Sequence, residues 1–262
     1  MSYETILFSV DEAIARLTFN RPGKLNSFNE AMHAEVRQAL ARVEPSGARV
    51  LVVTGAGRGF CAGQDLGDRA VTPGAAGADL GDSIELNYKP LVLALTSLPM
   101  PVIAAVNGVA AGAGANIALA CDLVIAARSA TFVQAFCRLG LVPDSGGTWT
   151  LPHLVGTARA LGLTLLGEKL SAEQAAAWGM IWQCVDDADL DSTVLGLARQ
   201  LAKGPTRGLA ATKAAIRGSG RHSLAEQLDL ERDEQRALGR SADYAEGVAA
   251  FAQKRAPNFT GR

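Results

Sequence analysis

The chain has 262 residues, of which 48% are hydrophobic but only 5% aromatic, so its core must be built largely from small residues and closely approaching backbones. Its 25 basic and 26 acidic residues leave a formal net charge of −1. A near-neutral chain lacks the basic excess that attracts nucleic acid or an anionic membrane, so neither is expected as an electrostatic partner. A local basic site for a phosphorylated ligand is compatible with this balance.

Four scattered cysteines and the N-terminal residues bear on the cellular compartment. The cysteines form no C-x-x-C pair and no histidine stands at metal-ligand spacing, so we expect a reducing compartment and no metal site. The first residues lack the basic start and apolar run of a signal peptide, and no uninterrupted apolar stretch is long enough to span a bilayer. The expectation is a cytoplasmic protein. The cysteines are Cys61, Cys121, Cys137 and Cys184.

The first part of the chain alternates strand-like and helix-like segments. Residues 5–10 and 13–19 are short β-prone runs that predict a hairpin. Asn29 is a suitable N-cap for a helix whose apolar residues recur at helical spacing over 32–43. The run VLVVT at 50–54 is continuous and largely β-branched, as expected of a strand that is buried on both faces.

The same alternation continues through the middle of the chain. Residues 67–82 are rich in Gly, Ala, Pro and Asp and indicate a surface loop, after which a helix is expected over 83–96. A strand at 102–106, a helix that ends at Ala120 and a strand at 123–126 follow. Buried strands that alternate with helices indicate βαβ units and a mostly parallel sheet.

The last part of the chain is almost entirely helical in pattern. From Gly146 onward the sequence favours helices, with a capping-box pattern at Ser171 and one further strand at 181–185. We therefore expect an α/β core over residues 1–200 and a C-terminal helical segment over residues 201–262.

Two glycine-rich loops, TGAGRGFCAGQDL at 54–66 and NGVAAGAGAN at 107–116, each follow a predicted buried strand. Their unshielded backbone N–H groups can bind an anion or a developing oxyanion, most strongly at a helix N-terminus. Dinucleotide binding is the competing interpretation. It fails because Phe60 and Ile117 stand where the third glycine of G-x-G-x-x-G would fall. The glycines can also serve only tight turns and close packing.

Five short signatures run in order along the chain and together resemble the enoyl-CoA hydratase/isomerase (crotonase) superfamily. They are NRP with LNS at 20–27, FCAGQDL at 60–66, PVIAAVNG at 101–108, GGT at 146–148 and FxxKRxPxF at 251–259. The resemblance implies an α/β fold of the crotonase (ClpP/crotonase-like) type, a spiral of repeated ββα units with a C-terminal helical trimerisation segment. It also implies an acyl-CoA thioester substrate and a homotrimer or dimer of trimers. No cofactor is implied, because coenzyme A is part of the substrate.

The resemblance also implies which residues form the site. The main-chain N–H groups of Gln64 and Ala113 would form an oxyanion hole around the thioester oxygen. Phe251 and Lys254 would reach the nucleotide end of the substrate from a neighbouring subunit. The residues that would line the adenine and pantetheine channel are Lys24, Leu25, Ala62, Asp65 and Leu66.

Departures from the family pattern indicate the reaction. Hydratases of the family use two glutamates to activate and deliver water, and Asn116 and Phe136 occupy those positions here. Neither can act as a general base, so hydration by that mechanism is not expected. Asp144 stands where some isomerases of the family carry a working aspartate, and apolar surroundings of Phe136, Leu141 and Trp149 would suit it to shuttling protons. Considered without the family, Asp144 lies in a turn sequence and would make a good N-cap.

Longer segments narrow the reaction further. LGLVPDSGGTW and WGMIWQCVDD are similar to the branch of the family that isomerises ring-epoxide arylacetyl-CoA esters and can also move an enoyl double bond from the 3,4 to the 2,3 position. A general Δ3,Δ2-enoyl-CoA isomerase, or an enoyl-CoA hydratase, is the alternative on the same scaffold. A non-catalytic CoA-binding or RNA-binding relative is the alternative of another class, against which the charge balance and Asp144 weigh. Cys61 and Cys137 are expected to pack as small hydrophobic residues.

Overall fold

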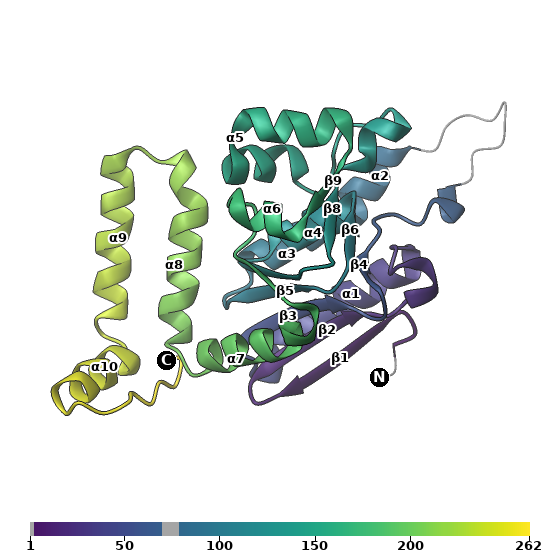
Figure 1. Ribbon diagram of the computed structural model, residues 1–262. Coiled ribbons are helices and arrows are strands. Elements are labelled where there is room, and N and C mark those ends of the chain that lie inside the picture. Colours follow the sequence, from purple (N-terminus) through teal and green to yellow (C-terminus); the bar gives the residue numbers. More distant parts are fainter. Residues whose placement is uncertain (1–2, 70–78) are drawn as a thin grey trace.

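The larger of two β-sheets carries six strands in the order β1-β2-β3-β5-β7-β10. The computed structural model describes residues 3–69 and 79–262 (Figure 1). Strands β1 and β2 form the predicted antiparallel hairpin, and the other neighbouring pairs are parallel, as predicted. The strands are β1 (Ile6–Asp11), β2 (Ile14–Phe19), β3 (Val50–Gly55), β5 (Val102–Val106), β7 (Leu123–Ala127) and β10 (Gln183–Val185).

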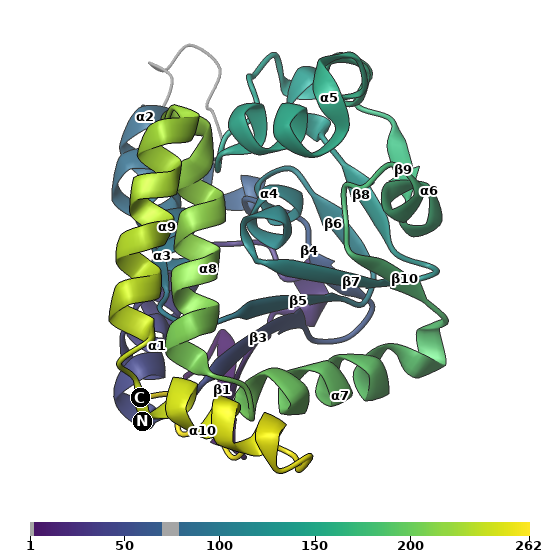
Figure 2. The same ribbon diagram turned by 90° about the vertical axis from the view of Figure 1, so that its left-hand side faces the viewer.

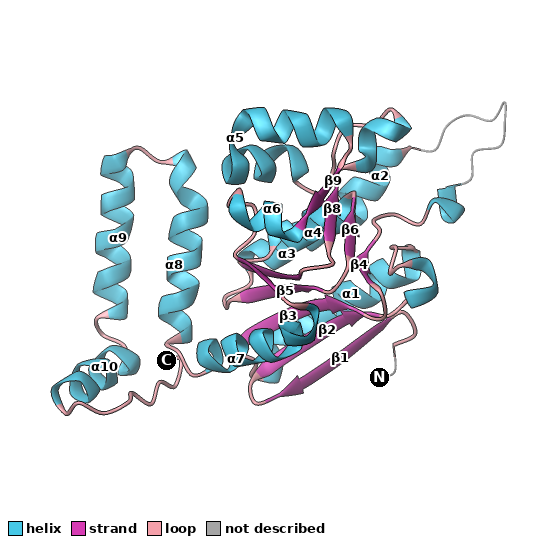
Figure 3. Cartoon of the chain, in the orientation of Figure 1, coloured by secondary structure: helices cyan, strands magenta, loops and turns pink. Residues whose placement is uncertain are grey.

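The central strands β3 and β5 are buried along their whole length. A parallel strand that is covered on both faces has a continuous apolar sequence, so these two strands could be predicted from their composition. Figure 3 shows the strands of both sheets packed among helices, with the hairpin strand β1 at the outer edge.

A second, four-stranded sheet has the order β4-β6-β8-β9. Its strands are β4 (Gly59–Cys61), β6 (Val109–Ala111), β8 (Thr131–Val133) and β9 (Lys169–Ser171). The sequence predicted glycine-rich loops where β4 and β6 lie and no strand at β8 or β9, and this was wrong. Three residues are too few for a recognisable period, and these strands form only because the neighbouring turns bring them together. The strand pairs β3–β4, β5–β6 and β7–β8 are each followed by a helix, which gives the repeated ββα unit.

Ten α-helices lie in the described parts of the chain. The side chain of Asn29 accepts a hydrogen bond from Met32 N at 3.0 Å, so the predicted cap of α1 is confirmed. The helix predicted over 83–96 is present, but a π-helical turn, Ile84–Tyr88, joins its two α-helical parts. The helices are α1 (Glu30–Val43), α2 (Leu80–Ser83), α3 (Lys89–Ser97), α4 (Ala113–Ala120), α5 (Gly147–Leu166), α6 (Ala172–Ala177), α7 (Leu190–Ala202), α8 (Thr206–Gly218), α9 (Leu224–Leu238) and α10 (Ala242–Ala252). Most of the loop predicted over 67–82 lies outside the described residues.

The C-terminal helices α8, α9 and α10 extend away from the core (Figure 1). Neither α8 nor α9 contains a buried residue. The segment is anchored through Lys213, whose ammonium group donates to Leu95 O at 3.0 Å and Met100 O at 3.1 Å. Lys213 also pairs with Asp122 at 2.9 Å, and Arg217 pairs with the same carboxylate at 2.8 Å. The predicted boundary at residue 200 lies close to the end of α7.

Candidate active site

The two glycine-rich loops meet in direct backbone contact. A β-carbon added to Gly63 would lie 2.9 Å from Ala111 O and 3.3 Å from Ala113 N. A β-carbon on Gly114 would lie 2.2 Å from the main-chain oxygen of Cys61. Any side chain at Gly63 or Gly114 would therefore push the loops apart, and the φ of Gly63, +87°, is itself one that L-residues rarely adopt. The contact brings Gln64, the residue after Gly63, beside Ala113.

Ala113 is the first residue of α4, and the N-cap of this helix is Gly112. The first N–H groups of an α-helix have no acceptor within the helix, and the helix dipole makes that end electropositive. All eight residues of α4 are buried, so this positive end is only weakly screened by water. The junction of the two loops can therefore stabilise a negative charge that develops on an oxygen atom.

Gln64 is held from two sides. Both of its neighbours in the chain are bonded to the main chain of Phe28. Phe28 N donates to Gly63 O at 2.7 Å, and Asp65 N donates to Phe28 O at 2.8 Å. The hydroxyl of the fully buried Tyr88 donates to the side-chain oxygen of Gln64 at 2.8 Å. Nothing in the sequence singles out Tyr88 as a site residue, because a single tyrosine in an apolar helix carries no signal of its own.

A cavity of about 550 Å³ lies beside Gln64. Side chains from α1 and from the helical segment before α3 line it, among them His33, Arg37 and Asn87. A neighbouring cavity of about 500 Å³ between α1 and α3 shares those three residues. The site therefore has room for an organic ligand next to the loop junction.

Asp144 is half-buried at the start of α5. The N-cap of this helix is Gly146, and no side chain caps it among the described residues. Asp144 supports the helix start through its main-chain oxygen, which accepts from Gly147 N at 2.9 Å, while its carboxylate accepts from Ser145 Oγ at 2.9 Å. The alternative interpretation of Asp144 as a side-chain N-cap is therefore wrong.

The surroundings of Asp144 are only partly as expected. Asn116 is 1% exposed and donates through Nδ2 to Asp144 O at 2.8 Å. Phe136 is buried and lies over Gly112, 3.7 Å from the position of a β-carbon there. Leu141 and Trp149, however, are 41% and 53% exposed, so the expected enclosure by three buried apolar side chains is not present.

The residues expected to line a CoA channel gather at two adjoining segments. Leu25 O accepts a hydrogen bond from Ala62 N at 2.9 Å, which joins the segments. Lys24 and Leu66, each next to one of these segments, are exposed. Asp65 differs from the others because it is buried.

Asp65 pairs with Arg21 at 3.0 Å and accepts from Gly67 N at 3.1 Å. Burial alone would raise the pKa of this carboxyl group, but the Gly67 N–H and the Arg21 guanidinium outweigh it and hold the pKa of Asp65 below its ordinary value. The carboxylate of Asp65 is thus committed to holding the loop in shape.

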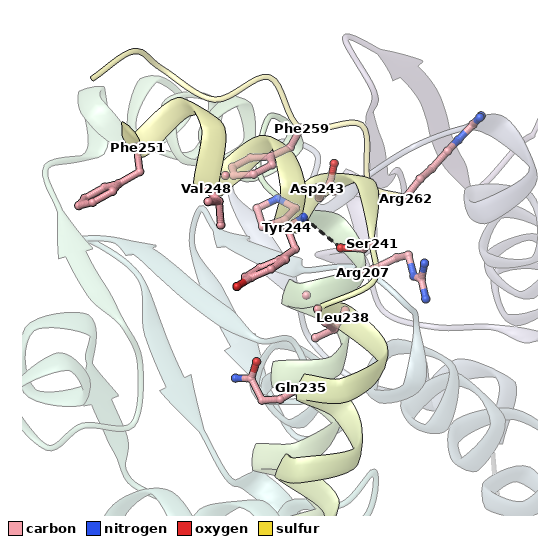
Figure 4. A pocket seen from close by; sticks show the side chains of 14 residues that line it. Arg207, Gln235, Leu238, Ser241, Asp243, Tyr244, Val248, Phe251, Phe259 and Arg262 are labelled. Carbon is pink, nitrogen blue, oxygen red and sulfur yellow. Dashed lines mark hydrogen bonds between the residues drawn. The ribbon is translucent and has the colours of Figure 1, made fainter. Parts of the chain in front are cut away.

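Phe251 and Lys254 do not meet the other candidate residues within one chain. Both lie at the end of α10, which Figures 1 and 2 place away from α4. Phe251 is 87% exposed and borders a cavity of about 410 Å³ between α8, α9 and α10. Figure 4 shows this cavity, with Tyr244, Val248 and Leu238 among the side chains around it.

Over residues 3–69 and 79–262, no group of three or more His, Cys, Asp or Glu side chains could hold a metal ion. None of the described helices is both long and apolar enough to cross a membrane. Burial raises the pKa of the Cys61 thiol to about 12 and that of Cys121 to about 12, which suits packing rather than nucleophilic work.

The sequence and the fold were compared with known proteins. The enoyl-CoA hydratase/isomerase family model matches residues 9–262. The chain is 60% identical over 260 residues to 1,2-epoxyphenylacetyl-CoA isomerase of Escherichia coli, covering 99% of each chain, and 51% identical to a probable enoyl-CoA hydratase of Rhodobacter capsulatus, covering 100% of each. The crystal structure of a putative enoyl-CoA hydratase/isomerase from Mycobacterium abscessus matches with a TM-score of 0.93 at 34% identity, covering 98% of this chain and 100% of that one. The chain belongs to the enoyl-CoA hydratase/isomerase family.

Proposed function

We propose that the protein is an acyl-CoA isomerase that converts 2-(1,2-epoxy-1,2-dihydrophenyl)acetyl-CoA to oxepin-CoA and also shifts 3-enoyl-CoA to 2-enoyl-CoA. The observation that carries the proposal is the double role of α4. Its first residue, Ala113, lies at the loop junction beside Gln64, and one turn later Asn116 bonds the main chain of Asp144. One short buried helix therefore connects an electropositive junction to a carboxylate. The 60% identity to the isomerase from Escherichia coli supports the choice of substrate.

The mechanism uses the loop junction as an oxyanion hole. The thioester oxygen would accept hydrogen bonds from the N–H groups of Gln64 and Ala113, which stabilise the negative charge that forms when the α-carbon loses a proton. Asp144 would take that proton from C2 of a 3-enoyl-CoA. The resulting dienolate carries charge at C4, and Asp144 returns the proton there, so the double bond moves from the 3,4 to the 2,3 position and no atom is gained or lost.

The ring epoxide uses the same groups. Polarisation of the thioester oxygen by Gln64 and Ala113 would make the carbon next to the ring more acidic, so that Asp144 takes a proton there and returns it to a ring carbon. The carbon–carbon bond of the epoxide breaks as the six-membered ring expands to the seven-membered oxepin, and no atom is gained or lost. Coenzyme A belongs to the substrate in this scheme, and no further cofactor is required.

Hydration is the second candidate function on this scaffold. The probable hydratase from Rhodobacter capsulatus, 51% identical, favours it. Against it stand Asn116 and Phe136, since an amide and a phenyl ring cannot activate water. The alternative that is not an enzyme is a non-catalytic CoA-binding protein. In such a protein the Asp144 carboxylate would have no catalytic role.

The C-terminal segment would complete the protein as a homotrimer or dimer of trimers. Its helices expose apolar side chains, among them Phe251 and Leu224, that a single chain leaves in water. In such an assembly Phe251 and Lys254 would contact the nucleotide end of a CoA ester or the neighbouring subunit. Truncation after residue 250 should then weaken CoA binding, dissociate the subunits, or both. A truncated protein that keeps its oligomeric mass and its Kd would contradict this role.

Three CoA esters test the proposal. The aryl epoxide and a 3-enoyl-CoA should both be isomerised, whereas a 2-enoyl-CoA in water should not accumulate 3-hydroxyacyl-CoA. In D2O, early product from the 3-enoyl-CoA should contain less than one deuterium at C4, because one carboxylate carries the same proton between the two carbons. Rapid formation of 3-hydroxyacyl-CoA would contradict the isomerase assignment. Turnover of none of the three, with CoA esters still bound, would favour the non-catalytic alternative.

A further inference from the structure

A chain of buried side-chain amides ends at Asp144. Gln134 Nε2 donates to Asn116 Oδ1 at 2.8 Å, and Asn116 Nδ2 donates to Asp144 O at 2.8 Å. Gln134 is 4% exposed and Asn116 is 1% exposed, so water does not compete for these bonds. The amide of Asn116 thus lies between a neighbouring loop and the loop that carries the carboxylate.

Keeping these amides buried has a cost for the fold. The side-chain oxygen of Gln134 is buried and has no hydrogen-bond partner among the described residues. Glycine at residue 147 leaves room for the Asn116 amide, since a β-carbon there would lie 2.4 Å from Asn116 Nδ2. Apolar side chains of similar shape at 116 and 134 would fill the space without an unpaired acceptor. Packing alone therefore does not account for the amides.

Asp144 is held at both ends, at its main-chain oxygen by the amide chain and at its carboxylate by Ser145. Its main-chain oxygen accepts from Asn116 and from Gly147 N at 2.9 Å, and its carboxylate accepts from Ser145 Oγ at 2.9 Å. Ser145 has a φ of +51°, a backbone conformation that a non-glycine residue adopts only where its surroundings enforce it. Because Asn116 belongs to the helix that begins at Ala113, its bond sets where the carboxylate stands relative to the loop junction.

We propose that Asn116 is a positioning residue that holds Asp144 at a fixed place relative to the N–H groups of Gln64 and Ala113, with Gln134 holding Asn116 in turn. The inference rests on the proposed function, in which Asp144 transfers the proton. It also explains the residue type at 116. An ionised glutamate at 116 could not donate a hydrogen bond to the Asp144 carbonyl oxygen. Residue 116 of this chain can therefore either act as a base or hold Asp144 in this way, but not both.

The test replaces the amide by an apolar side chain of similar shape. Asn116→Leu should retain the Kd for a non-reacting CoA ester within about twofold while kcat for a 3-enoyl-CoA falls about tenfold or more, since misplacing a catalytic group affects the chemical step. Early product in D2O should also gain deuterium, because a loosened carboxylate exchanges its proton with solvent before returning it. A folded Asn116→Leu protein with the wild-type kcat and the wild-type isotope content would overturn the proposal.

Two further variants keep the test decisive. Gln134→Leu removes the hydrogen bond one step further from Asp144, and it replaces Asn116→Leu in the test if that variant does not fold. It should also lower kcat. The kcat of the double variant should be no lower than that of Asn116→Leu alone. Additive losses would contradict the chain of bonds. Ser171→Ala removes the hydrogen bond that Gln174 N donates to Ser171 Oγ at 3.2 Å at the start of α6, and should lower the melting temperature without changing kcat. Asp144→Asn is measured alongside, since a fully active Asp144→Asn would reject the proposed function itself.

Discussion

The hydroxyl of Tyr88 donates to the side-chain oxygen of Gln64 at 2.8 Å, and this bond links the π-helical turn before α3 to the loop junction. One helical turn later, Val92 lies 3.8 Å from the position of a β-carbon on Gly146. One side of this helix therefore touches the loop of Gln64 and the loop that carries Asp144. The two halves of the site are connected by α3 as well as by α4.

Removing the hydroxyl of Tyr88 tests the first of these links. Tyr88→Phe keeps the ring, whose centroid lies 4.6 Å from that of the His33 ring, but loses the hydrogen bond to Gln64. A bond worth about 1 kcal/mol corresponds to a loss of about fivefold in kcat/KM for a 3-enoyl-CoA. Tyr3→Phe is the matched control, because its hydroxyl only meets Arg42 at 3.4 Å on the surface. Equal kcat/KM in the wild type and Tyr88→Phe would show that the hydroxyl does not hold the site.

A methyl group at Gly63 should separate the two loops. Gly63→Ala must fit a β-carbon 2.9 Å from Ala111 O at a φ of +87°, so we expect a loss of about 1–3 kcal/mol in the free energy of unfolding. The displaced N–H groups should also cost about a hundredfold in kcat. Gly196→Ala in α7, where nothing lies within 4 Å of the new β-carbon, should be neutral or slightly stabilising. Urea unfolding and initial rates measure both effects, and a Gly63→Ala enzyme with normal kcat would argue against an oxyanion hole at this contact.

The ion pair between Asp65 and Arg21 should make stability depend on pH. The pKa of Asp65 in the folded protein lies below the ordinary 3.8, so its contribution is complete above that value and is lost as the pH falls through the folded-state pKa. Asp65→Asn should therefore lower the free energy of unfolding by about 2 kcal/mol or more at neutral pH, and by much less in strong acid. Asp191→Asn is the control, because that carboxylate is 80% exposed in its pair with Arg16 and should change little. The free energies of unfolding of Asp65→Asn and the wild type should therefore be compared across pH. A difference between them that stays constant with pH would show that the ion pair does not make stability depend on pH.

The buried thiols should be inert in the folded protein. Burial raises the pKa of Cys61 to about 12, so almost no thiolate exists at about pH 8. Iodoacetamide should alkylate the partly exposed Cys137 and Cys184 first, and Cys61 and Cys121 only after unfolding. Peptide mass spectrometry of folded and urea-treated protein measures the order. Rapid labelling of Cys61 in the folded enzyme, with loss of activity, would assign it a chemical role instead.

The large sheet could be predicted from the sequence, whereas the small sheet could not. Strands β3 and β5 are continuous apolar runs, because both of their faces are covered. Strands β4 and β6 each have three residues inside glycine-rich stretches, and their pairing depends on contacts between distant segments. Local pattern carries no information about such contacts, so these stretches could only be predicted as loops.

The candidate site shows the same division. Gln64, Ala113 and Asp144 stand in recognisable motifs, and the fold brings the loops of the first two together. Tyr88 and Gln134 lie in ordinary sequence, and their importance comes from the hydrogen bonds that each makes to a residue far away in the chain. The expected apolar enclosure was overestimated, because exposure of a side chain is decided by packing rather than by its neighbours in sequence.

Replacing the carboxylate of Asp144 by an amide separates proton transfer from substrate binding. Asp144→Asn keeps the size of the side chain but removes the carboxylate that would carry the proton. We expect kcat for a 3-enoyl-CoA to fall by about two orders of magnitude or more, while the Kd for a non-reacting CoA ester stays within about twofold. Single-turnover measurements make the chemical step visible. If the variant retains kcat near that of the wild type with chemistry rate-limiting, Asp144 is not the base and the proposed mechanism is wrong.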